Sequence, residues 1–129
     1  MMAEINILSA GAIAPGLRKI SEALQRETTR HVNLTFATAP VIVERLRDSA
    51  SIDIVIAPRA VLDDVARSGK ISNLGRVLLG RIGAGVMVRA GVPQPPIATV
   101  EQLKKSLLDA TSVVFNRAST GTYLENLFR

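Results

Sequence analysis

The fold is decided by the stretch INILSAGAIAPG, residues 5–16. Its first half is apolar enough for a buried strand, because isoleucine and leucine leave little polar surface there. Small residues follow, among them Gly11, which is able to take backbone angles closed to other residues. Pro15 then predicts the first turn of a helix, where a missing N–H is tolerated. The apolar face expected for this helix consists of Ile13, Leu17, Ile20 and Leu24.

Such a corner between a strand and a helix is a natural place for an anion. Backbone N–H groups and the positive end of the helix dipole point at one position there. A purely structural turn explains residues 5–16 equally well, so the corner alone does not establish a binding site.

The same design recurs twice along the chain. Alternating apolar residues predict a strand at 32–36, and an apolar run predicts another at 53–57. Each continues into a helix through small residues, ATAP at 37–40 and AP at 57–58. The resulting β-α-β-α-β-α order predicts an α/β fold with three layers, αβα, and a mainly parallel sheet. Because the carboxyl ends of parallel strands meet at one sheet edge, we expect a shallow ligand crevice at that edge.

The pattern changes in the remainder of the chain. Residues 73–89 are apolar and rich in glycine, which predicts extended strands with a bend. The proline-rich run 91–96 is the best candidate for a linker. A capping box from Thr99 to Gln102 begins a further helix, and a strand at 112–115 precedes the last one.

Composition limits the function classes. The 129 residues carry a net charge of +5, from 16 basic and 11 acidic side chains, which favours an anionic partner. The basic residues are dispersed and not interleaved with aromatic side chains, so nucleic acid is not expected as a partner. The absence of cysteine excludes disulfides and thiol catalysis. No apolar run reaches the length of a membrane span and no export signal is evident, so a soluble chain is expected.

Side chains that carry catalysis are scarce. His31 is the single histidine and precedes a strand, where a structural role is favoured over catalysis. Asp63 and Asp64 are adjacent on a helix and therefore point to different faces. The glycine patterns of phosphate and dinucleotide sites are both absent. We therefore expect a protein that is not an enzyme and that uses no cofactor and no metal.

The candidate binding residues lie in the small-residue loops at the starts of helices. Hydroxyls and amides at such positions hold an oxyanion without transforming it. Helix capping is the alternative role of the hydroxyls, and Arg59 and Arg117 are more readily explained as surface charges. The predicted ligand-binding residues are Ser9, Ala10, Gly11, Ala12, Thr38, Ala39, Pro58, Ser119, Thr120, Gly121 and Thr122.

Four separated blocks carry a resemblance to a known family. ILSAGA at 7–12, FATA at 36–39, DIVIAP at 53–58 and GAGVMVR at 83–89 resemble the periplasmic molybdate-binding proteins. These are solute receptors of ABC transporters within the type II periplasmic binding-protein superfamily. Such proteins have two α/β lobes, joined by hinge strands, that close on an oxyanion held by hydroxyls and backbone N–H groups. The resemblance implies a periplasmic receptor that delivers molybdate or a similar small oxyanion to a transporter permease.

The resemblance also implies how the chain divides. Members of that family are nearly twice as long, so residues 1–89 are expected to form the first lobe with hinge-type strands. Residues 90–129 are expected to form a linker and the incomplete start of a second lobe. Its exposed elements would pack on their own lobe or exchange with another copy, which would give a homo-oligomer. The alternative is a cytoplasmic ligand-sensing or regulatory domain of the same fold, which the lack of an export signal favours.

Overall fold

The computed structural model describes residues 4–48, 51–72 and 74–129. The chain forms two compact units, of which one ends at Val77 and the other begins at Leu78. The predicted division into lobes after residue 89 stays a prediction. Within the described ranges, no helix combines the length and the apolar character that crossing a membrane requires.

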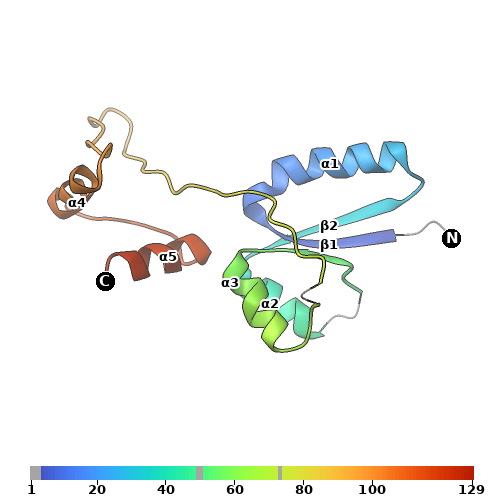
Figure 1. The fold of residues 1–129 in the computed structure, drawn as a ribbon. Helices are drawn as coiled ribbons and strands as arrows, with labels where there is room; N and C mark the ends of the chain where they lie inside the picture. Colours follow the sequence, from blue (N-terminus) through green and yellow to red (C-terminus); the bar gives the residue numbers. More distant parts are fainter. Residues whose placement is uncertain (1–3, 49–50, 73) are drawn as a thin grey trace. The chain divides into compact units, whose positions relative to one another are not determined.

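The first unit is built on a parallel sheet of three strands (Figure 1). They are β1 (Glu4–Ala10), β2 (His31–Ala37) and β3 (Ile54–Ile56), and their order across the sheet is β2-β1-β3. β1 is central and pairs with β2 along its whole length, whereas β3 pairs with residues 7–9 of β1. The short, apolar first strand expected from the opening stretch is therefore the centre of the sheet.

Helices cover this sheet on both faces (Figure 1). α1 (Ala14–Glu27) packs on one face, and α2 (Ala39–Asp48) and α3 (Arg59–Arg67) pack on the other. A single 3₁₀ turn, η1 (Gly11–Ile13), links β1 to α1. The predicted three-layer α/β fold with a parallel sheet is confirmed.

Successive residues of β1 supply the two halves of the core, because neighbouring strand residues point to opposite faces. Ile7 belongs to the apolar cluster beneath α1, and Leu8 belongs to the cluster beneath α2 and α3. Leu8 is 2% exposed and Ile42 of α2 is 0% exposed. The buried members are Ile7, Leu17 and Val32 in the first cluster, and Leu8, Ile42, Leu46 and Val65 in the second.

The second unit carries α4 (Val100–Asp109) and α5 (Ser119–Leu127). The hydroxyl of Thr99 accepts a hydrogen bond from the N–H of Gln102 at 3.2 Å, as the predicted capping box requires. The side-chain oxygen of Gln102 accepts from the N–H of Ala98 at 3.0 Å, one residue before the expected partner. The start of α4 is therefore capped from both directions.

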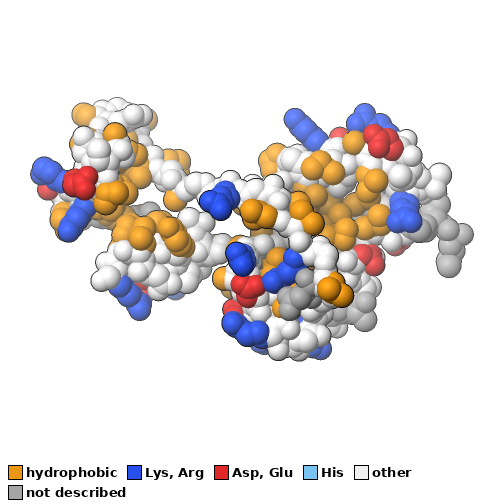
Figure 2. Space-filling view, in the orientation of Figure 1, with side chains coloured by type: hydrophobic (Ala, Val, Ile, Leu, Met, Phe, Trp, Pro, Cys, Tyr) orange, Lys and Arg blue, Asp and Glu red, His pale blue; other side chains and the backbone are white. Residues whose placement is uncertain are grey.

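The strands predicted beyond residue 73 are wrong for the described residues. Residues 76–89 and 112–116 form neither helix nor strand, and residue 73 lies outside the described ranges. Their apolar side chains are largely uncovered, with Leu78 73% and Met87 95% exposed, and Figure 2 shows apolar side chains at the surface. A strand needs a neighbour for its N–H and C=O groups, and no described segment supplies one here.

Candidate functional site

Three corners between a strand and a helix meet at the carboxyl edge of the sheet. The register pairs Ala10 with Ala37 and Ser9 with Ile56, so the ends of the three strands lie side by side. The residues that follow them begin η1, α2 and α3. The convergence predicted from the β-α-β pattern is therefore present in the first unit.

The strand order gives this edge a preferred position for a ligand. From β1 the chain winds outward to β2, and it then crosses back to place β3 on the other side of β1. In open parallel sheets, ligands bind outside the strand ends at the point where the winding direction changes. That point lies between β1 and β3, flanked by residues 10–13 and 57–59.

The corner after β1 is formed by small, exposed residues. Gly11 and Ala12 are both exposed, and a Cβ placed on Gly11 would meet nothing within 4 Å. Gly11 does not adopt a positive φ, so this corner does not use the wider range of backbone angles that glycine is able to take. Its missing side chain instead leaves space beside the start of α1, where Pro15 occupies the first turn as predicted.

The two hydroxyls predicted for this edge differ in accessibility. Ser9 is fully buried, and its hydroxyl donates to the carbonyl oxygen of Ala10 at 3.0 Å. Thr38 is exposed between β2 and α2, and its carbonyl oxygen accepts the N–H of Ile42 at 2.9 Å. Of the two, the Thr38 side chain is the one that solvent reaches, and the half-buried Ala39 follows it as the first residue of α2.

The corner after β3 brings a cation to the same edge. Pro58 has extended backbone angles, and its carbonyl oxygen accepts the N–H of Leu62 at 3.2 Å, which begins α3. Arg59 is the first residue of this helix, and its side chain is 92% exposed. Arg59 therefore adds a guanidinium beside the point where the winding direction changes.

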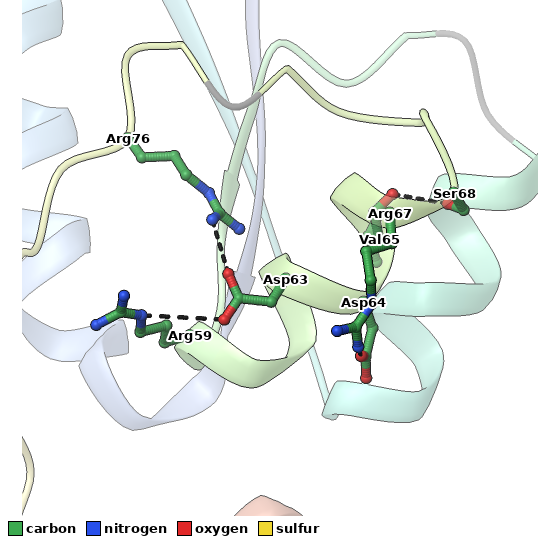
Figure 3. Close-up of polar contacts among 7 residues, drawn as sticks. All are labelled: Arg59, Asp63, Asp64, Val65, Arg67, Ser68 and Arg76. Atoms are coloured by element: carbon green, nitrogen blue, oxygen red, sulfur yellow. Dashed lines mark hydrogen bonds and ion pairs between the residues drawn. The ribbon is translucent and has the colours of Figure 1, made fainter.

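Arg59 belongs to a group of three charged side chains (Figure 3). Nη1 of Arg76 lies 2.8 Å from Oδ1 of Asp63, and Nε of Arg59 lies 3.9 Å from Oδ2 of the same carboxylate. The hydrogen bond from Arg76 lowers the pKa of Asp63 below its ordinary value of 3.8. Desolvation opposes this shift, and the positive charges of Arg76, Arg59 and Arg67 lower the pKa further. Two guanidinium cations around one carboxylate leave one net positive charge near the edge.

The histidine and the second aspartate considered in the sequence analysis lie away from the corners or have a partner. His31 is exposed at the first residue of β2, the end of the strand opposite to the corners. Asp64 forms an ion pair with Arg67, so the two adjacent aspartates have different partners, as expected for neighbours on a helix. In the described ranges, no group of three or more acidic or histidine side chains is placed to hold a metal ion.

The other predicted residues belong to the second unit. The side-chain oxygen of Asn116 accepts from the N–H groups of Ala118 at 2.9 Å and Gly121 at 3.3 Å, so Asn116 caps α5. The sequence analysis missed this asparagine, which lies two residues before the N-cap residue Ala118, so the preference for asparagine at the N-cap itself does not mark it. The first turn of α5 is formed by the predicted residues Ser119, Thr120, Gly121 and Thr122.

Comparison with known proteins now identifies the family. Residues 5–129 match the family described as bacterial extracellular solute-binding protein. This chain belongs to that family. The resemblance to periplasmic solute receptors is thereby confirmed at the level of a solute-binding protein, and the match carries no information on molybdate.

A relative of known name adds a different kind of information. Aconitate isomerase from a Pseudomonas species is 30% identical to this chain over 130 residues. The alignment covers 95% of this chain and 49% of the relative, so the chain spans about half the length of that curated relative.

This similarity contradicts the expectation that the protein is not an enzyme, because the relative bears the name of an enzyme. The expectation rested on a single histidine, no cysteine and two adjacent aspartates that point to different faces of a helix. These residues span about half the length of that relative, so the lack of catalytic side chains among them does not exclude catalysis.

Proposed function

We propose that this protein binds a small carboxylate anion of the class of aconitate at the carboxyl edge of the sheet β2-β1-β3. The observation that supports this most strongly is the strand register, which brings the corners after all three strands to one edge. N–H groups at the starts of the helices have no partner within their own helix and favour an anion there. The name of the relative supplies the chemical class, since aconitate is a tricarboxylate.

The charge of the edge agrees with an anionic ligand of more than one charge. Arg59 stands there as an exposed cation, and the group that it forms with Asp63 and Arg76 has an excess of one positive charge. The whole chain is also positive, with a net charge of +5. A positive potential of this kind raises the rate at which a polyanion meets its site.

We further propose that the protein catalyses the isomerisation of aconitate or of a similar tricarboxylate. An isomerisation conserves all atoms of the substrate and requires no second substrate. Fixing the carboxylates holds the carbon skeleton in one orientation while its double bond is rearranged. The residues of the first unit recognise the carboxylates at the corners after β1, β2 and β3.

A receptor that delivers molybdate or another tetrahedral oxyanion to an ABC transporter permease is the second candidate. Amides at helix starts bind any oxyanion, which supports it. The buried Ser9 is evidence against this candidate, because its hydroxyl donates to a carbonyl within the sheet. Of the two hydroxyls predicted at this edge, Thr38 is then the exposed one. Because the family is extracellular, we place either function outside the cytoplasm.

Isothermal titration of the purified protein with trans-aconitate, citrate, molybdate and sulfate tests the proposal. We expect the two tricarboxylates to bind at least about tenfold more tightly than the two tetrahedral oxyanions, a difference of about 1.4 kcal/mol. Proton NMR of the aconitate sample would then follow the appearance of a second isomer, for which citrate is the unreactive control. Binding of molybdate without aconitate would favour the transport receptor, and binding of neither class would refute the proposed site.

A pair of matched variants locates the binding. Gly11→Asp places a negative charge in the open space at the corner after β1, and its Cβ meets no atom within 4 Å. Gly83→Asp adds the same charge at another glycine whose Cβ would be unobstructed, in the second unit. We expect the first variant to lose aconitate binding by repulsion while the second retains it, with both remaining folded by circular dichroism. Equal affinities of the two variants would place the ligand elsewhere.

A further inference from the structure

We propose that Arg59 selects a carboxylate ligand at this edge, and that Arg76 keeps Arg59 available by occupying Asp63. The inference rests on the proposed function and adds to it the residue that recognises the ligand and the residue that positions it. All three side chains belong to the first unit.

Arg59 has the exposure and the free donors that a ligand needs. It is the first residue of α3, its side chain is 92% exposed, and its contact with Asp63 runs through Nε at 3.9 Å. In Figure 3 the guanidinium extends away from the helix, with its two terminal nitrogens beyond the contact with Asp63. Paired N–H donors of this kind match the two oxygens of a carboxylate, whereas a lysine offers a single point of charge.

Asp63 is the natural competitor of such a ligand. It lies one helical turn after Arg59, which places both side chains on one side of α3. A carboxylate at this position could bind Arg59 closely and neutralise it. The structure instead holds the two groups at 3.9 Å, too far apart for a hydrogen bond.

Arg76 is the reason that Asp63 does not capture Arg59. It reaches α3 from the segment that follows the helix and donates to Asp63 at 2.8 Å (Figure 3). Its side chain is 32% exposed, compared with 92% for Arg59, so it is the more enclosed of the two arginines. Arg76 therefore balances the carboxylate, and the excess positive charge remains on Arg59.

The other end of α3 provides an internal comparison. There Arg67 and Asp64 form a direct ion pair with each other, and their charges cancel. Both side chains are more than half exposed. Arg67 is neutralised because, among the described residues, no second arginine engages the Asp64 carboxylate. Arg67 is therefore the matched control for Arg59 on the same helix.

Titration of four variants with trans-aconitate tests the assignment. Arg59→Gln is expected to weaken binding about 10- to 100-fold, because it removes a charge-assisted pair of hydrogen bonds. Arg59→Lys is expected to restore part of the loss, since it keeps the charge without the paired donors. Arg76→Gln is expected to weaken binding about two- to fivefold by releasing Asp63 to pair with Arg59. The double variant Asp63→Asn with Arg76→Gln is expected to regain the affinity of the unchanged protein.

Two controls separate this role from a structural one. Arg67→Gln is expected to leave the affinity for trans-aconitate unchanged. Carbon-detected NMR of the Asp63 carboxyl in Arg76→Gln is expected to show its pKa raised toward 3.8, because the strongest lowering contact has gone. That shift shows that the ion pair has been broken, and an unchanged circular dichroism spectrum of the same variant shows that it is folded.

The outcomes distinguish this inference from the proposed function. If the unchanged protein binds neither aconitate nor citrate, both are overturned. If it binds them and Arg59→Gln binds equally well, the role of Arg59 is wrong while the proposed function stands. If Arg76→Gln is weakened and the double variant is not restored, Arg76 does not act through Asp63.

Discussion

Replacing Ile42 with alanine is expected to lower the free energy of unfolding by about 2–5 kcal/mol. Ile42 is 0% exposed on α2 and belongs to the apolar cluster that also contains Leu8 of β1 and Val65 of α3. Truncation removes buried methyl and methylene groups and leaves a cavity between the central strand and both helices of this face. Urea denaturation followed by circular dichroism measures the loss.

Ile20→Ala is the matched control, because it makes the same change on another helix of the first unit. Ile20 lies on α1 and is 65% exposed, although its spacing predicted that it belonged to the apolar face. Its truncation is expected to change the free energy of unfolding by less than about 0.5 kcal/mol. Equal losses for Ile20→Ala and Ile42→Ala would contradict the described division between core and surface.

Gly121→Ala is expected to destabilise the start of α5 by about 1–3 kcal/mol, because the residue has no room for a side chain. A Cβ at this position would overlap the backbone carbonyl group of Asn116, which is not free to turn aside as a long side chain is. The displacement would also separate the N–H of residue 121 from the Asn116 side chain that caps the helix. Hydrogen exchange of the α5 amide groups measures the loss of protection.

Gly16→Ala is the control for this prediction. Gly16 lies in the first turns of α1, and a Cβ placed there meets nothing within 4 Å. Alanine is favoured over glycine in a helix, so this variant is expected to be stabilised by about 0.5–1 kcal/mol. Stabilisation by both substitutions would show that Gly121 is not packed against Asn116.

The sequence was sufficient for the elements of the first unit because short-range signals specify each of them. Alternating apolar residues mark β2, and Pro15 marks the start of α1, both without reference to distant parts of the chain. The convergence of the three corners then follows from the handedness of β-α-β connections, which holds for nearly all parallel sheets. The sheet edge at which the candidate site lies was therefore predictable from the sequence.

The strands expected at residues 73–89 and 112–115 failed for a physical reason. An apolar segment rich in β-branched residues forms a strand only beside a partner, and partners are set by long-range pairing that a local pattern does not contain. The described residues offer none to these segments, and side chains such as Met87 stay exposed.

Details of the candidate site were also beyond local patterns. Ser9 looked like a ligand contact, but its place in the central strand buries it. The pair of Arg76 and Asp63 joins residues 13 positions apart through a loop whose path the sequence does not specify. The sequence contains one histidine, no cysteine and no carboxylate pair placed for catalysis, from which we expected a protein that is not an enzyme. The similarity to a relative named as an isomerase contradicts that expectation.

The central claim is that the corners after β1, β2 and β3 bind one anionic ligand together. Titration of ¹⁵N-labelled protein with trans-aconitate, followed by amide NMR, tests it most directly. We expect the signals of Gly11, Thr38 and Arg59 to move together with a single dissociation constant. Shifts confined to the opposite end of the sheet around His31, or separate constants for the three corners, would contradict the claim.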